Sequence, residues 1–82
     1  MIEVLFFAQL REQLKCSEVA VSANTANSVL QLRDYLILQY PDWAEFLTNP
    51  ALLIAVNQTL VKLSHAVNSG DEIAFFPPVT GG

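Results

Sequence analysis

The chain has 82 residues, enough for one small domain and too few for two. Hydrophobic residues make up 52% of it and charged residues only 15%, whereas disordered chains are poor in apolar residues and rich in charge. The formal net charge is −4, and the four cationic side chains (Arg11, Lys15, Arg33 and Lys62) are scattered rather than clustered as phosphate binding requires. Disorder is therefore excluded, and a nucleic-acid partner is not expected.

Cysteine content and hydropathy bear on where the protein works. The single cysteine, Cys16, has no second cysteine with which to form an internal disulfide, which favours a reducing compartment. The chain begins Met-Ile-Glu, with an acidic residue where a leader would carry basic ones, and the longest uncharged run, residues 46–61, is interrupted by proline and polar residues. Because a membrane span needs about 20 mostly apolar residues, we expect a cytoplasmic protein with no membrane partner.

Hydrophobic periodicity sets the order of the elements along the chain. We predict strands over residues 2–7, 18–22, 52–56, 59–63 and 72–76, a short helix over 8–15, a main helix that runs to residue 40, and a short helical turn over 42–47. A cluster of capping residues at 24–28 precedes the main helix, and Pro41 ends it. The order is therefore strand, short helix, strand, main helix and three further strands.

The main helix supplies one apolar stripe for the sheet to cover. Its apolar positions Val29, Leu32, Leu36 and Tyr40 recur at spacings of three, four and four residues. One long helix and five short strands bury their apolar surfaces most economically as an α+β fold, in which a mixed five-stranded sheet wraps over one face of the helix. We assign residues 1–76 to this domain and residues 77–82 to an extended, flexible tail.

The tail, residues 77–82, reads Pro-Pro-Val-Thr-Gly-Gly. Two prolines favour an extended stem, and two glycines carry no side chain to obstruct a narrow slot. A Gly-Gly pair alone is also compatible with a frayed terminus, but fraying does not call for a stiff spacer. The α-carboxylate of Gly82 is ionised at neutral pH and can attack the α-phosphate of ATP to form an acyl adenylate. The pattern thus points to a carboxyl terminus that is activated and carried into another protein's active site.

Three segments resemble a known family. Residues 4–12 (VLFFAQLRE), 57–61 (NQTLV) and 70–82 (GDEIAFFPPVTGG) closely resemble the small, sulfur-carrier subunit of molybdopterin synthase. Residues 16–50 are compatible with that family in pattern but are not distinctive. The resemblance implies the ubiquitin-like β-grasp fold.

The resemblance also implies a chemistry for Gly82. An adenylyltransferase similar to ubiquitin-activating enzymes would adenylate Gly82 with ATP, and a persulfide donor would provide the sulfur of a C-terminal thiocarboxylate. The segment that enters the large synthase subunit would consist of Pro77, Pro78, Val79, Thr80 and Gly81. There the sulfur would pass to cyclic pyranopterin monophosphate to build the molybdopterin dithiolene. Two small subunits would flank a dimer of large ones, so that this chain is a sulfur donor in a heterotetramer, with no cofactor and no turnover of its own.

Strand alternation predicts a surface on which a partner docks. A charged residue on the same side of a strand marks its wet face, and by this criterion Phe7, Leu60 and Phe76 face solvent. We predict that they form an apolar docking patch, with Arg11 as a contact at its rim. Isolated exposed apolar residues are common, and Arg11 is equally compatible with a solvated helix position.

The other polar candidates are not expected to take part in catalysis or metal binding. Cys16 is interpreted as structural because no clear base accompanies it, and His65 has no companion ligands, so no metal site is predicted. Asp71 and Glu72 are interpreted as a solvated acidic pair. The chain contains no glycine-rich phosphate loop, so we expect the activating partner to bind the ATP.

Two other functions remain open at this point. The same tail chemistry suits a related sulfur carrier that serves thiamine or a thiolated tRNA base. It also suits a ubiquitin-like protein modifier that forms isopeptide bonds through Gly82.

Overall fold

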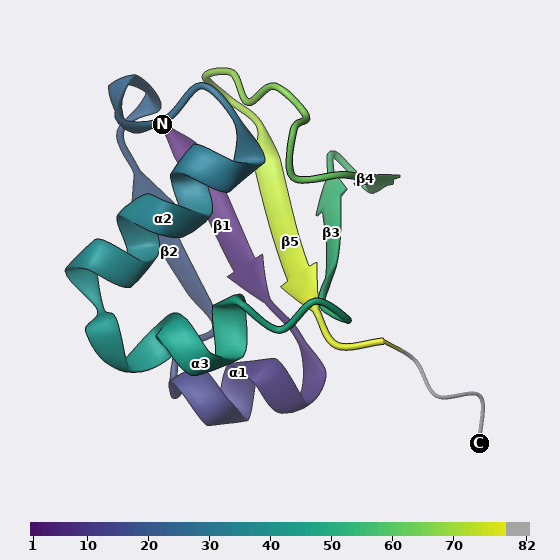
Figure 1. The fold of residues 1–82 in the computed structure, drawn as a ribbon. Coiled ribbons are helices and arrows are strands. Elements are labelled where there is room, and N and C mark those ends of the chain that lie inside the picture. Colours follow the sequence, from purple (N-terminus) through teal and green to yellow (C-terminus); the bar gives the residue numbers. More distant parts are fainter. Residues whose placement is uncertain (79–82) are drawn as a thin grey trace.

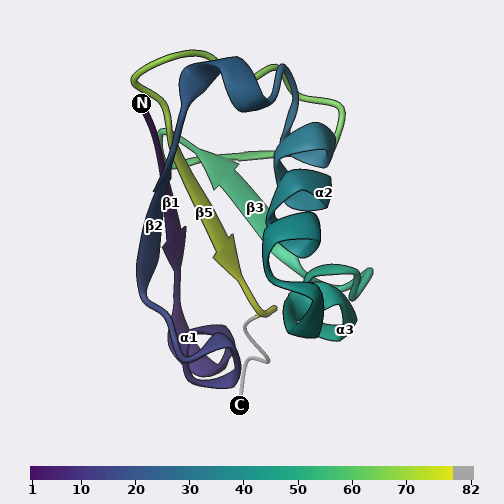
Figure 2. The ribbon, with the colours of Figure 1, turned by 90° about the vertical axis from the view of Figure 1, so that its left-hand side faces the viewer.

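The computed structural model describes residues 1–78. The strands are β1 (Ile2–Phe6), β2 (Glu18–Val21), β3 (Leu53–Val56), β4 (Thr59–Val61) and β5 (Glu72–Phe76). The helices are α1 (Ala8–Leu14), η1 (Ala23–Thr25), α2 (Val29–Gln39), η2 (Pro41–Trp43) and α3 (Ala44–Leu47). Figures 1 and 2 show one sheet with α2 packed across one of its faces. The predicted α+β class, with a mixed five-stranded sheet over one main helix, is confirmed.

The strand order is β2-β1-β5-β3-β4. The first and last strands, β1 and β5, are parallel neighbours in the middle of the sheet, and Val4 pairs with Ile73 across them. The other neighbouring pairs, β1 with β2, β3 with β5 and β3 with β4, are all antiparallel. The chain therefore closes its sheet by inserting its last strand between β1 and β3 (Figure 1).

The core lies between the sheet and α2. Strand alternation sends every second side chain of β1 and β5 toward the helix, as predicted. The fully buried core residues of these elements are Ile2, Val4, Phe6, Ile73 and Phe75 from the strands and Val29, Leu32 and Leu36 from α2. Phe6 joins the two layers, because its ring packs edge-on against Trp43 at 5.3 Å and stacks with Phe75 at 6.1 Å.

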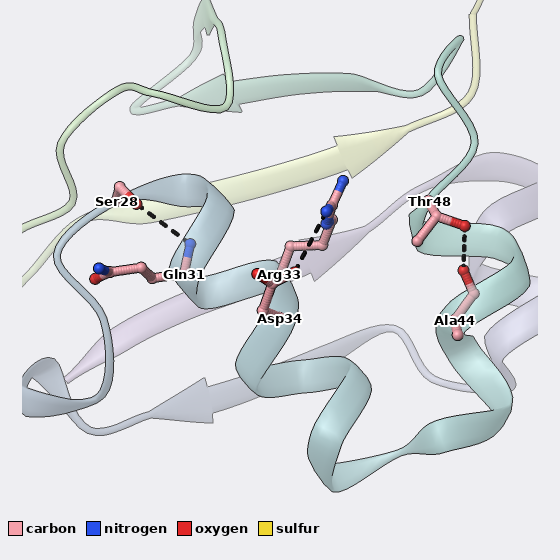
Figure 3. Close-up of polar contacts among 6 residues, drawn as sticks. All are labelled: Ser28, Gln31, Arg33, Asp34, Ala44 and Thr48. Carbon is pink, nitrogen blue, oxygen red and sulfur yellow. Dashed lines mark hydrogen bonds and ion pairs between the residues drawn. The ribbon is translucent and has the colours of Figure 1, made fainter.

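The start of α2 is fixed by side chains that satisfy free backbone N–H groups. The Ser28 hydroxyl accepts a 3.2 Å hydrogen bond from the backbone N–H of Gln31 (Figure 3). Gln31 Oε1 in turn accepts one from the backbone N–H of Asn27 at 2.8 Å. These contacts confirm the capping cluster predicted before the main helix.

The end of α2 differs from the prediction. The helix ends at Gln39, and Tyr40 lies outside it with 44% of its surface exposed. Because Pro41 cannot continue the helix, the chain turns at Tyr40, and its ring stacks on Trp43 at 4.1 Å instead of entering the core. The prediction that Tyr40 continues the buried stripe is therefore wrong.

Residues with positive φ mark the turns between the strands. Asn57 and Gln58 have φ values of 51° and 71° and form the two-residue connection between β3 and β4, a geometry that matches the twist of a hairpin. Gly70, at φ 88°, lies in the turn that precedes β5, where a glycine adopts this conformation without strain. Lys15, at φ 56°, ends α1.

Within residues 1–78, every helix is too short or too polar to cross a bilayer.

Candidate functional site

The base of the tail lies at one end of the domain. Strand β5 runs from the end that holds the N-terminus to the opposite end, where α1 and α3 lie (Figures 1 and 2). Phe76, its last residue, pairs with Leu53 of β3, and Pro77 and Pro78 follow without regular structure. The predicted site residues Val79, Thr80, Gly81 and Gly82 lie outside the described residues.

The face of the sheet turned away from α2 carries a row of apolar side chains. Leu5 pairs with Ala74, Ala74 with Ala55, and Ala55 with Leu60, across four adjacent strands. The next row of paired residues, one position along, is Phe6, Phe75, Ile54 and Val61, and it faces the core. Side chains alternate between the two faces of a sheet, so the first row lies on the outer face, where Leu60 is exposed and Ala55 is buried.

The three predicted docking residues belong to this outer face. Phe7 continues the extended backbone of β1, and its N–H donates a 3.2 Å hydrogen bond to the Phe75 carbonyl, which places it beside the end of β5. Phe7 is 44% exposed, Leu60 is 63% exposed and Phe76 is half-buried. Leu60 lies two strands from β5, about 10 Å away at ordinary strand spacing.

Two further residues complete this surface. Leu5 and Leu53 are half-buried on the outer face. The outer apolar face thus consists of Leu5, Phe7, Leu53, Leu60, Ala74 and Phe76. The apolar run at residues 52–56 contains no charged residue to mark a wet face, so Leu53 was missed, although its position two residues before Ala55 places it on the same side.

Charged residues border the outer apolar face. Glu3 pairs with Glu72 on the parallel strands β1 and β5, so two carboxylates lie side by side at the end opposite to the tail. Arg11 is exposed on α1, the helix that follows Phe7 directly. The outer face is thus acidic at the end opposite to the tail, and Arg11 lies at an exposed position of the helix at the tail end (Figure 1).

Asp71 has a structural role that the sequence did not indicate. Its carboxylate accepts hydrogen bonds from the Asn68 backbone N–H at 2.8 Å and from Asn57 Nδ2 at 3.0 Å. These hydrogen bonds, the Asn68 bond above all, lower the pKa of Asp71, and the nearby His65 adds a smaller effect in the same direction. Asp71 is therefore more than a solvated charge, because it also accepts the hydrogen bonds that fix the turn before β5.

Cys16 and His65 take part in local structure. Cys16 is half-buried, and its Sγ donates to the Glu18 carbonyl at 3.3 Å. His65 is exposed, and its backbone carbonyl accepts from Val29 N–H at 3.0 Å. Over residues 1–78, no three His, Cys, Asp or Glu side chains gather as metal ligands would.

Comparison with known proteins places these features in a family. The chain is 50% identical to the molybdopterin synthase sulfur carrier subunit of Escherichia coli, over the full length of both chains. Its fold matches small archaeal modifier protein 1 of H. volcanii with a TM-score of 0.82 and 26% identity, covering 95% of this chain and 97% of that one.

A third relative is found within a complex. The fold matches a chain of the complex of subunits 1 and 2 of molybdopterin-converting factor from Helicobacter pylori, with a TM-score of 0.68 and 28% identity, covering 99% of this chain and 97% of that one. The ThiS family itself matches residues 4–82, a range that includes the outer apolar face, the proline stem and the Gly-Gly pair. On its sequence and its fold, the chain belongs to the ThiS family.

Proposed function

We propose that the chain is the sulfur-carrier subunit of molybdopterin synthase and that Gly82 carries the sulfur. The observation that supports this most strongly is the 50% identity, over the whole of both chains, with the E. coli protein of that name. The proline stem that follows β5 gives the carrier a way to present Gly82 away from its domain.

The proposed cycle begins with the Gly82 carboxylate. Its oxygen attacks the α-phosphate of ATP, pyrophosphate leaves, and a glycyl adenylate forms. The terminal sulfur of a persulfide then displaces AMP, and a second thiol cleaves the resulting acyl disulfide, becoming oxidised as it does so. The product is a thiocarboxylate, whose sulfur bonds to cyclic pyranopterin monophosphate. Water then cleaves the bond between the Gly82 carbonyl carbon and the sulfur, so that the sulfur stays on the pterin and Gly82 returns as a carboxylate.

This chain acts in the proposed cycle as a donor and not as a catalyst. The partners are an adenylyltransferase that binds the ATP, a persulfide donor, and the large synthase subunit into which residues 77–82 extend. The H. pylori relative is named in a complex of two subunits, which supports a heteromeric assembly, and two carriers on a dimer of large subunits is the arrangement we propose. A cytoplasmic location agrees with the reduced, unpaired Cys16.

We further propose that the outer apolar face docks the carrier onto its protein partners. The face carries exposed Phe7 and Leu60 on the sheet and adjoins the base of the tail at Phe76. Aromatic and aliphatic anchors of this kind account for most of the affinity in protein interfaces. Docking through this face would aim residues 77–82 at the partner, with Arg11 as a contact at the rim.

Intact-mass spectrometry tests the carrier chemistry. With the activating enzyme, ATP and a persulfide donor, the chain should exchange one oxygen for one sulfur, and a variant that lacks Gly81 and Gly82 should not. The thiocarboxylated chain should then yield molybdopterin when it is mixed with the large synthase subunit and the pterin precursor. Sulfur uptake without molybdopterin formation would point instead to a thiamine or tRNA carrier.

A protein modifier is the second candidate, because the fold resembles small archaeal modifier protein 1. In that case the chain would appear in cells joined to lysines of other proteins through Gly82. The identity to that modifier is 26%, about half of the identity to the E. coli carrier, so the carrier is the function we favour. Isopeptide-linked conjugates in place of thiocarboxylate would reverse this choice.

A further inference from the structure

A cavity of about 360 Å³ lies on the helix side of the sheet, between α2, the segment after α3, and the hairpin of β3 and β4. Its apolar lining consists of Leu47, Pro50, Leu52, Ile54, Val61 and Leu63. Ile54 and Val61 face the core side of their strands, so the cavity opens away from the outer apolar face. It is therefore separate from the surface that we propose for docking.

One cavity residue, Arg33, has a buried donor that lacks a partner. Its Nε is enclosed and has no hydrogen-bond acceptor among residues 1–78, and its side chain is only 20% exposed. The guanidinium meets Asp34 through Nη2 at 3.3 Å (Figure 3), which leaves Nε unused. Buried N–H groups in folded proteins are nearly always paired, so this donor points to an acceptor that the cavity receives from outside the chain.

The other polar groups of the cavity also favour an anion. Lys62 lines the cavity and has no ion pair within the described part of the chain. The Thr48 hydroxyl already donates to the Ala44 carbonyl (Figure 3). Asn49 Oδ1 already accepts from the Ala51 N–H, which leaves the Asn49 amide group as a donor. The Arg33 guanidinium and the Asn49 amide thus bring positive charge and donors to an apolar cavity, in a protein whose net charge is −4.

We propose that this cavity binds a carboxylate borne on a short apolar chain. Arg33 would hold the carboxylate with a fork of donors that includes Nε, Lys62 would add charge, and the apolar chain would lie against Leu52 and Leu63. The cavity is at the lower end of the usual range for ligand sites, about 300–1,000 Å³. A small organic acid and a glutamate side chain of a partner peptide share this chemistry.

The experiment follows the Nε–H signal of Arg33 by ¹⁵N NMR in the full chain. The sequence contains only two arginines, so Arg11 provides an internal reference in the same spectrum. The probes are sodium octanoate and a capped Leu-Glu-Leu peptide, with octanol and octylamine as the uncharged and cationic controls. We expect a saturable shift of the Arg33 signal with a carboxylate probe and no shift of the Arg11 signal.

Variants test whether Arg33 itself holds the ligand. In calorimetric titrations with the same probes, which do not need the Arg33 signal, Arg33→Gln should weaken binding roughly tenfold or more, and Lys62→Gln should weaken it several-fold. Lys15→Gln, which removes a cation remote from the cavity lining, should bind as the wild type does. If Arg33→Gln fails to fold, Arg33→Lys keeps the charge without the fork and should show an intermediate loss.

Each outcome decides the proposal. Tighter binding of octanoate identifies a free acid as the source of the carboxylate, and tighter binding of the peptide identifies a protein segment. The proposal is overturned if neither probe shifts the Arg33 signal, if octanol or octylamine binds as well as octanoate, or if the Arg33 variants keep full affinity. A chain that lacks Gly81 and Gly82 should bind the same probe equally well, so the result is independent of the proposed sulfur chemistry.

Discussion

Asn57 Nδ2 donates a 3.0 Å hydrogen bond to Asp71 Oδ1, across 14 positions of sequence. The same Asn57 accepts from the Glu72 N–H through its side chain at 3.1 Å and donates its own N–H to the Glu72 carbonyl at 2.8 Å. These contacts attach the β3–β4 turn to the start of β5. Because Leu60 follows that turn, the Asn57–Asp71 contact holds one anchor of the outer apolar face in register with the strand that leads to the tail.

Replacement of Asp71 should change how stability depends on pH. Its pKa in the folded protein lies below the ordinary value of 3.8, so the ionised carboxylate stabilises the fold above that value. This contribution is lost as the pH falls from about 4 through the lowered pKa. Asp71→Asn should therefore cost about 1 kcal/mol at neutral pH and flatten the acid limb of a urea-denaturation series. Asp42→Asn, at an exposed position of η2, is the control, and an acid limb identical in wild type and Asp71→Asn would contradict the assignment.

Leu60 and Leu38 are both exposed leucines and can be compared as a test position and its control. Leu60 is 63% exposed on the outer face, and Leu38 is 76% exposed on α2. If the outer apolar face docks the large subunit, Leu60→Ala should weaken binding by about 2 kcal/mol, roughly 30-fold, whereas Leu38→Ala should leave it unchanged. Calorimetric titration with the large subunit measures both. A Phe76→Ala variant that keeps its affinity for the large synthase subunit and for the adenylyltransferase would contradict the docking proposal.

Phe6 and Phe7 are neighbours in sequence with opposite environments. Phe6 is 1% exposed and packs against Trp43 and Phe75, so Phe6→Ala should lower the free energy of unfolding by about 3–5 kcal/mol. Phe7 is 44% exposed on the other face, and Phe7→Ala should cost less than about 1 kcal/mol. Chemical denaturation of the two variants compares them directly. Equal losses would mean that β1 does not alternate between core and outer face as described.

Ser28 should contribute to stability through the first turn of α2. Its hydroxyl accepts from Gln31 N–H, so Ser28→Ala should cost about 1 kcal/mol. Ser28→Asp keeps an acceptor at the same place and should restore most of the loss. Thermal unfolding of the three proteins measures this, and an unchanged midpoint for Ser28→Ala would show that the hydrogen bond adds nothing to the fold.

Local periodicity predicted well which side chains are buried within the helices and strands. It predicted less well the environment of residues at the ends of these elements. The alternation that places Val4 and Phe75 in the core needs only the two-residue repeat of a strand. Tyr40 was mispredicted because the 3.6-residue repeat was extended one turn beyond the point at which Pro41 redirects the chain. Asp71 escaped notice because its partner Asn57 is distant in sequence.

Some features of the candidate site were likewise predictable from the sequence, and others were not. The exposure of Phe7 and Leu60 followed from charged residues on the same faces of their strands, and the structure confirms it. Leu53 was missed because an apolar run does not reveal its phase until the strand register is known. The enclosed Nε of Arg33 was also not predictable, since a charged residue in a helix is ordinarily read as solvated, and only the packing of α2 against the β3–β4 hairpin encloses it.

The parallel pairing of β1 with β5 has a consequence for biosynthesis. The strand made first and the strand made last are direct neighbours at the centre of the sheet, so a ribosome-bound chain that stops before residue 72 leaves β1 and β3 without the partner between them. Such long-range pairing is completed late and slowly. An incompletely synthesised chain therefore lacks the central strand of its sheet. In this architecture the domain can fold, and its C-terminal carboxylate can be activated, only after translation is complete.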